Sequence, residues 1–184
     1  KVTDKKTGRV REVRYSDIVI LLRSFTKYAD VFQETLEQKK IPVHASSKTG
    51  YFQTPEIQTV LSLLRILDNP RQDIPLAAVL RSVLFGFSDE ELSILRMAEK
   101  KKPFHRCVLE PAWDTLSSEL GKKLKAFLET LSKFRDLAAE LSVHALLFRI
   151  LEDTGYARLA AAMPGGERRR ANIEMLLEKA AAYE

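Results

Sequence analysis

Several sequence features that carry chemistry in other proteins are missing from this chain of 184 residues. Cys107 is the single cysteine, which excludes an internal disulfide framework and fits a reducing cytoplasm. There is no GxxxxGK[ST] phosphate cradle and no GxGxxG turn, so the chain is not expected to assemble a nucleotide site unaided. No stretch approaches the ~18 consecutive apolar residues that are needed to span a bilayer.

Metal and nucleophile chemistry find no support in the residue spacing. His105 and Cys107 are two residues apart, whereas His44 and His144 lie far away in the sequence. No second cysteine or carboxylate falls at ligand spacing, so we expect no metal site. Cys107 has no base that the sequence can nominate as its partner, and a small buried thiol is the ordinary interpretation.

Composition describes a globular chain with a mild basic excess. Hydrophobic residues make up 45% and charged residues 30%, and the net charge is +5 from 30 basic and 25 acidic residues. This charge is compatible with a nucleic-acid partner but does not require one. The chain starts at Lys1 without an initiator Met and ends at Glu184 within a helical pattern. We therefore expect a piece of a longer protein, with room for one domain or a small domain and part of another.

The first fifty residues predict a small α/β portion. The apolar run that covers Asp17–Arg23 is typical of a strand buried on both faces. A helix is expected over 28–40 and a second short strand over 41–44, which together form a βαβ unit with a right-handed crossover. Residues 1–16 predict a polar arm or hairpin that leads into the first strand.

The rest of the chain predicts a helical bundle, so the expected fold class is mainly α, with domains at 1–50 and 51–184. Thr54 and Pro55 begin a helix, and Ser88 with Glu91 forms a capping box. A long helix is expected over 118–141, and Thr154-Gly155 ends the helix that follows it. Apolar residues recur on one stripe of each helix, which is typical of helices that bury one face against each other.

Arg23 is the sharpest chemical feature of the sequence. It stands at the carboxyl end of the predicted strand, where open α/β sheets bind ligands. The planar guanidinium group suits phosphate, and such an arginine can stabilise the charge that develops on a transferred γ-phosphoryl group. The alternative is an edge arginine that pairs with a carboxylate.

The order of segments resembles a known family. Residues 17–24, the helix that contains Phe32–Leu36, and Ile41-Pro42-Val43 are similar to motif IV of UvrD-like superfamily 1 DNA helicases. Residues 50–57, Gly-Tyr-Phe-Gln-Thr-Pro-Glu-Ile, resemble the adjoining motif, in which paired aromatics precede a helix. Residues 57–70 and 170–177 are similar to helices of the inserted 2B subdomain. Residues 80–92 look most like the AddA-type helicase/nuclease of bacterial AddAB complexes.

The resemblance implies a role for each half of the chain. Residues 1–50 would be part of the RecA-like domain 2A, and 51–184 a truncated helical 2B subdomain. Arg23 matches the motif IV arginine, which contacts the γ-phosphate of ATP across the cleft between the motor domains. DNA contacts would fall on two groups of residues: Lys48, Tyr51 and Phe52, and the turn Gly86, Phe87 and Ser88.

The function implied by the resemblance is that of an ATP-dependent DNA helicase with nuclease activity, which acts in double-strand break repair and recombination. Its cofactor would be ATP with Mg, and its partners DNA and an AddB-type protein, in the cytoplasm. The Walker, later helicase and nuclease motifs are absent, so this piece alone is expected to be inactive and to hold no cofactor. Two alternatives remain: a non-enzymatic helical module that binds protein or nucleic acid, and a nucleotide-dependent switch that is not a motor.

Overall fold

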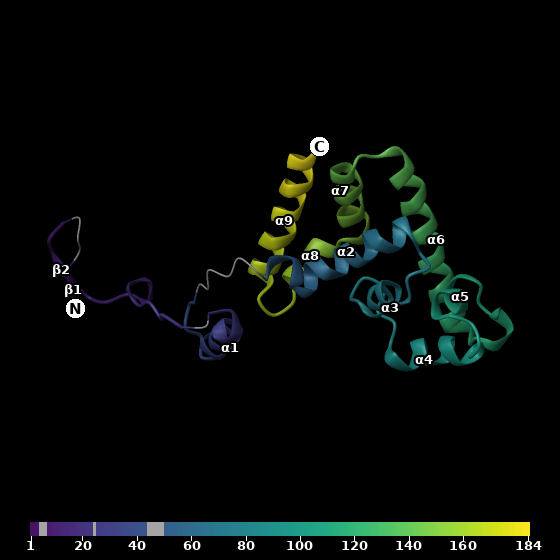
Figure 1. Ribbon diagram of the computed structural model, residues 1–184, viewed down its shortest axis with the longest axis horizontal. Helices are drawn as coiled ribbons and strands as arrows, with labels where there is room; N and C mark the ends of the chain where they lie inside the picture. The colour runs from purple at the N-terminus through teal and green to yellow at the C-terminus, as the bar shows by residue number, and fades with distance from the viewer. Residues whose placement is uncertain (4–6, 24, 44–49) are drawn as a thin grey trace. The chain divides into compact units, whose positions relative to one another are not determined.

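The computed structural model describes residues 1–3, 7–23, 25–43 and 50–184. The chain divides into two compact units, Lys1–Tyr51 and Phe52–Glu184. Within the described residues it is mainly α, as the sequence predicts, with one small sheet (Figure 1).

The N-terminal unit contains a short hairpin, a 3₁₀ turn and one helix. Strands β1 (Val2–Thr3) and β2 (Val10–Arg11) pair antiparallel. The 3₁₀ helix η1 covers Tyr15–Asp17, and α1 covers Phe25–Gln38. Arg11 donates two hydrogen bonds to the Asp17 carboxylate, each 2.6 Å long, and thereby ties the hairpin to the 3₁₀ turn. The polar hairpin and the helix of this region are thus confirmed.

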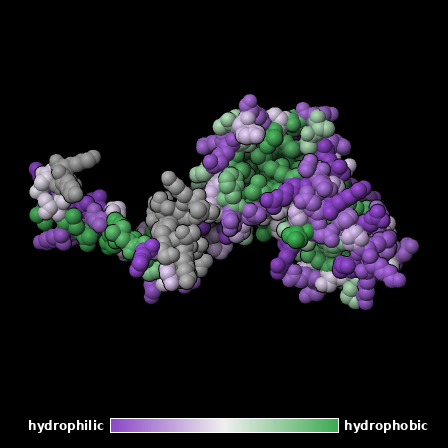
Figure 2. All heavy atoms as spheres, in the orientation of Figure 1, coloured by the Kyte–Doolittle hydropathy of each residue, from purple (hydrophilic) through white to green (hydrophobic). Residues whose placement is uncertain are grey.

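The predicted buried strand over Asp17–Arg23 is wrong, because the described residues of this segment form no ladder. Residues 18–22 are irregular, and Leu21 is 90% exposed (Figure 2). A strand buried on both faces needs a neighbour at each edge and a layer over each face, and the described part of this unit supplies neither. Ile41–Val43 also forms no strand, while His44 lies outside the described residues. The expected βαβ unit is therefore not formed here.

The second unit is helical throughout its regular structure. It begins with the last two residues of the 3₁₀ turn η2 (Tyr51–Gln53) and contains another, η3 (Trp113–Thr115). Its α-helices are α2 (Pro55–Asp68), α3 (Asp73–Arg81), α4 (Asp89–Ala98), α5 (Phe104–Leu109), α6 (Ser118–Glu140), α7 (Val143–Thr154), α8 (Tyr156–Ala161) and α9 (Gly166–Tyr183).

Local sequence signals account for most helix ends. Pro55 occupies the first turn of α2, where its missing N–H has no intrahelical partner to lose. Ser88 accepts a hydrogen bond from the Glu91 N–H, and the Glu91 side chain accepts one from Ser88, which is the predicted capping box. Ser142 caps α7, and Gly155 ends it at φ 63°, a conformation that favours glycine.

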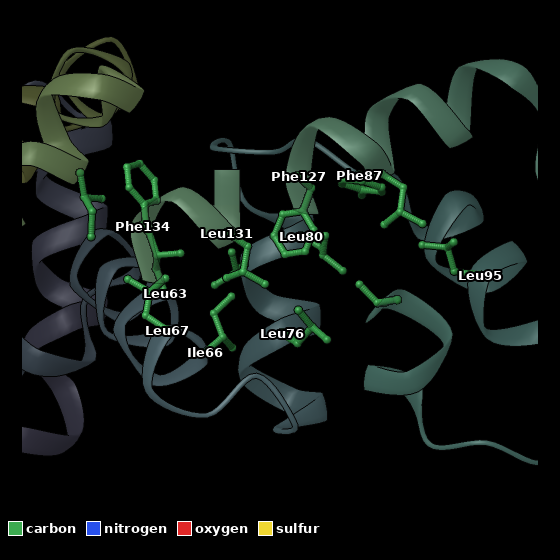
Figure 3. Packing of buried hydrophobic residues seen from close by; sticks show 14 of the residues in the cluster. Leu63, Ile66, Leu67, Leu76, Leu80, Phe87, Leu95, Phe127, Leu131 and Phe134 are labelled. Carbon is green, nitrogen blue, oxygen red and sulfur yellow. The ribbon is translucent and has the colours of Figure 1, made fainter. Parts of the chain in front are cut away.

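One apolar core joins α2 to the middle of the unit. Leu63 and Ile66 of α2 lie against Leu80 of α3 and Phe127 and Leu131 of α6 (Figure 3). Phe127 is 1% exposed and meets the Phe85 ring edge-on, with 4.8 Å between ring centroids. The stripes read from the sequence are therefore the buried faces of these helices.

Candidate functional site

Arg23 lies on the surface of the N-terminal unit. It forms a bend at the end of the irregular run 18–22, two residues before α1 begins. Its side chain is exposed. The position is open to a phosphate group, although the strand expected to present the residue is not formed.

The paired aromatics lie where the chain enters the helical unit. Tyr51 and Phe52 belong to the 3₁₀ turn η2, directly before Thr54 and Pro55. Phe52 is 53% exposed, and its carbonyl accepts a hydrogen bond from the Gln58 side chain. An exposed ring on a braced turn can stack on a base. Lys48, the third residue predicted here, lies outside the described residues.

The turn before α4 uses its backbone donors internally. The Gly86 N–H donates to Ser82 O at 2.7 Å, and the Phe87 N–H donates to Leu80 O at 2.9 Å. The Ser88 N–H donates to the Glu91 carboxylate. Phe87 is 2% exposed, and its ring lies beside Phe127 in the core (Figure 3). A phosphate at this turn would therefore compete with existing hydrogen bonds.

Lys123 of α6 braces the same turn from a distance in the sequence. Its Nζ donates to Gly86 O at 2.8 Å and to Glu91 Oε2 at 2.6 Å. The ammonium group also lies 4.6 Å from the centroid of the Phe87 ring. The bond from Lys123 holds the pKa of Glu91 below its ordinary value. Lys123 thus joins α6, the turn and the capping box of α4.

The charge around this turn is balanced rather than basic. The first turn of α4 carries Asp89, Glu90 and Glu91, which complement the positive end of the helix dipole. Asp89 pairs with Arg81 at 2.9 Å. A groove of about 400 Å³ beside the turn is bordered by Lys123 and Lys133, each paired with a carboxylate. The geometry favours a structural role for this cluster.

Metal sites and membrane spans find no candidate in the described parts of the chain. Residues 1–3, 7–23, 25–43 and 50–184 contain no cluster of three or more His, Cys, Asp or Glu side chains that could hold a metal ion. No helix among these residues is long and apolar enough to cross a membrane. Cys107 is buried, and its Sγ lies 3.5 Å from Pro103 O.

Three polar residues with long-range partners were missed by sequence reasoning about sites. Lys123 belongs to a basic cluster that is typical of a solvated helix face, and Asp73 suggests a cap for its own helix. Asp73 instead accepts hydrogen bonds from the N–H groups of Phe104 and His105 at the start of α5. Glu56 is 3% exposed and pairs with Arg169. Their partners are 31 to 116 residues away, so no local spacing signal could identify them.

Comparison with known proteins gives the class of protein. The UvrD-like helicase C-terminal domain family matches residues 3–136, which is more than two thirds of the chain. The chain belongs to this family.

Individual relatives are more specific. The chain is 45% identical over 183 residues to the AddA-type ATP-dependent helicase/nuclease of Thermoanaerobacter sp. (strain X514). The proteins of the same name from Ruminiclostridium cellulolyticum and Oceanobacillus iheyensis are 44% and 42% identical. Each match covers all of this chain but only 14–15% of the relative. The chain therefore spans about one seventh of the length of these relatives.

Proposed function

We propose that this chain is part of an AddA-type ATP-dependent DNA helicase/nuclease, and that it spans part of motor domain 2A and the helical 2B insertion. The observation that carries the proposal is identity of 41–45% over the full chain to proteins of that name. The motif IV arginine of the resemblance falls on Arg23, which is exposed in the N-terminal unit. The cofactor of the longer protein would be ATP with Mg.

Arg23 would act on the nucleotide that a second motor domain holds. Its guanidinium is permanently charged and can bond two phosphate oxygens at once. Negative charge on the transferring phosphoryl group is what such an arginine stabilises, and the gain in rate can be on the order of 10³-fold. The chain's own contribution is therefore one cation, presented next to the start of α1.

The proposed DNA contacts differ in how directly the geometry supports them. Phe52 is exposed and can stack on a base, and Tyr51 and Lys48 complete the same group. At Gly86, Phe87 and Ser88 the backbone donors are engaged and the Phe87 ring is buried, so this part of the proposal depends on rearrangement of the turn. The parent protein would act in DNA double-strand break repair and recombination in the cytoplasm, together with an AddB-type partner.

The test of this function is Arg23→Ala in the longer protein. We expect DNA-stimulated ATP turnover to fall by about 100-fold or more, because charge on the γ-phosphate loses its partner. DNA affinity should change by less than about threefold. Arg9→Ala removes another exposed arginine of the same unit and should leave both quantities unchanged.

Unchanged turnover together with lost DNA binding would overturn the assignment of Arg23 and favour the non-enzymatic binding module. The isolated 184-residue chain is expected to show no ATP turnover, and robust turnover would contradict a split nucleotide site. A gene that encodes no phosphate-cradle motif beside this segment would remove the motor interpretation as a whole.

A further inference from the structure

A buried carboxylate lies at the start of the helical unit. Glu56, in the first turn of α2, is 3% exposed; it and Ser62 are the buried polar or charged residues of the described chain. Arg169 Nη1 donates to Glu56 Oε2 at 2.8 Å, and Asn172 Nδ2 donates to Glu56 Oε1 at 2.6 Å. Both donors come from α9. The Tyr156 hydroxyl, from α8, donates to the Glu56 carbonyl at 3.1 Å.

These four residues (Glu56, Tyr156, Arg169 and Asn172), here called the Glu56 cluster, join three helices through one polar centre. Arg169 Nε also donates to Pro164 O at 3.0 Å, which ties the segment between α8 and α9 to the same point. Burial opposes ionisation of Glu56, but the bonds from Asn172 and the backbone together with the charge of Arg169 outweigh it and hold the pKa below its ordinary value. The carboxylate is therefore charged and compensated inside the protein.

The apolar contacts of α8 and α9 form a group of their own. Tyr156 and Ala160 of α8 and Ile173 and Leu176 of α9 are at most 6% exposed, yet none belongs to the main core cluster. The remaining buried residues outside that cluster include Ile57, Val60, Leu147 and Leu151. Helix α9 packs against α2, α7 and α8. Figure 1 shows it crossing the start of α2, at the opposite end of the unit from α4 and α5.

We propose that α8 and α9 form an arm, residues 156–183, that opens and closes on the helical unit as one body, and that the Glu56 cluster is the device that secures it. The arm shares few buried side chains with the main core, so it can detach without unfolding α3–α6. Opening separates a carboxylate from its two donors, which makes the closed position specific. The proposal does not depend on nucleotide chemistry.

The location of Glu56 gives the device its interest. Glu56 is four residues beyond Phe52, at which the helical unit begins. The polypeptide that connects the two units therefore enters the same turn of α2 that holds the arm. A shift at the start of α2 acts directly on the bonds to Arg169 and Asn172.

Amide hydrogen exchange of the whole chain, followed by mass spectrometry of peptides, tests the arm. In the unchanged protein, peptides from 156–183 should exchange through an opening that is at least about 10-fold more populated than that of peptides from α3–α6. Glu56→Gln removes the charge at almost the same volume. It should raise exchange in 156–183 by a further factor of about 10 or more, because Arg169 is left without its carboxylate. Exchange in α3–α6 should change by less than about twofold.

Glu90→Gln is the matched control, since it removes an exposed first-turn carboxylate from α4. It should leave exchange in 156–183 unchanged. If Glu56→Gln fails to fold, Arg169→Lys keeps the charge and should give a smaller rise in the same peptides. Equally populated openings for α3–α6 and for the arm in the unchanged protein would overturn the proposal, as would a rise that spreads evenly over the unit in either variant.

Discussion

The two units treat the same kinds of residue in opposite ways. In the helical unit, Leu63 is 1% exposed and Ile66 is fully buried. In the N-terminal unit, Leu21 is 90% exposed and Ile20 is 49% exposed. Among its described side chains, Ala29 is the buried apolar residue of that unit. Hydrophobicity of a segment therefore does not determine burial; a neighbouring layer does.

The difference follows from how each element satisfies its backbone. A helix makes its own hydrogen bonds and needs only a facing apolar stripe, which the successive helices 55–183 provide to each other. A central strand needs strands at both edges as well as covered faces. A helical segment can therefore complete its core within residues 52–184, whereas the run 18–22 offers apolar surface without a sheet to join.

The largest expected effect contrasts two leucines. Leu63→Ala should destabilise the helical unit by about 3–5 kcal/mol, because it leaves a cavity in the core. Leu21→Ala should change the free energy of unfolding by less than about 0.5 kcal/mol, because the side chain is already in water. Urea denaturation followed by circular dichroism measures both values. Similar losses for the two variants would show that the run 18–22 is buried after all.

A second contrast concerns two carboxylates of different reach. Asp73 bonds α5 from 31 residues away, whereas Asp17 is bonded by Arg11 and Arg14 within six residues. Asp73→Asn should lower the free energy of unfolding of the helical unit by about 1 kcal/mol, discounted because the carboxylate is partly exposed. Asp17→Asn should leave that transition unchanged. Equal losses in urea denaturation of the two variants would remove the distinction between a long-range and a local bond.

The pH dependence of the Asp73 effect has a defined sign. Partial burial opposes its ionisation, but the bonds from His105 and Phe104 outweigh this and place the pKa of Asp73 below its ordinary value of 3.8. The stabilisation is thus fully present above that value and is lost as the pH falls through the lower folded pKa. The difference between the Asp73→Asn variant and the unchanged protein should shrink below about pH 4. A difference that grows in acid would contradict the ionised acceptor.

The smallest effect concerns two adjacent lysines of α6. Lys123→Met should destabilise the helical unit by about 0.5–1 kcal/mol and speed amide exchange at Gly86–Ser88, because the brace on the turn is lost. Lys122→Met removes the exposed neighbour and should do neither. If Lys122→Met loosened the turn equally, net charge rather than the contacts of Lys123 would be responsible.

Much of the fold could be predicted from local patterns. The capping box at Ser88, the stop at Gly155 and the stripes of α2 and α6 are all properties of a few neighbouring residues, and each is confirmed. The strand over 17–23 was wrong because an apolar run predicts burial only when the rest of a sheet is at hand. The predicted cap at Asp73 failed for a related reason, since the carboxylate found donors in α5.

The candidate site was partly accessible in the same way. Arg23 and the aromatic pair Tyr51 and Phe52 were singled out by position in the sequence and lie at or near the surface. The sequence could not indicate that Lys123 would occupy the carbonyl of the turn at Gly86, 37 residues away. Nor could it indicate that the ring of Phe87 would point into the core.

By itself the sequence determined a helical protein with a short polar N-terminal hairpin, the ends of most helices, and one arginine suited to phosphate. Helix ends and apolar stripes depend on residues within one or two turns, so they can be read from neighbours. The tertiary structure alone decided which polar groups meet: Glu56 with Arg169, Asp73 with His105, and Lys123 with Glu91. These pairs join residues far apart in the chain, and only the packing of complete helices brings their charges together.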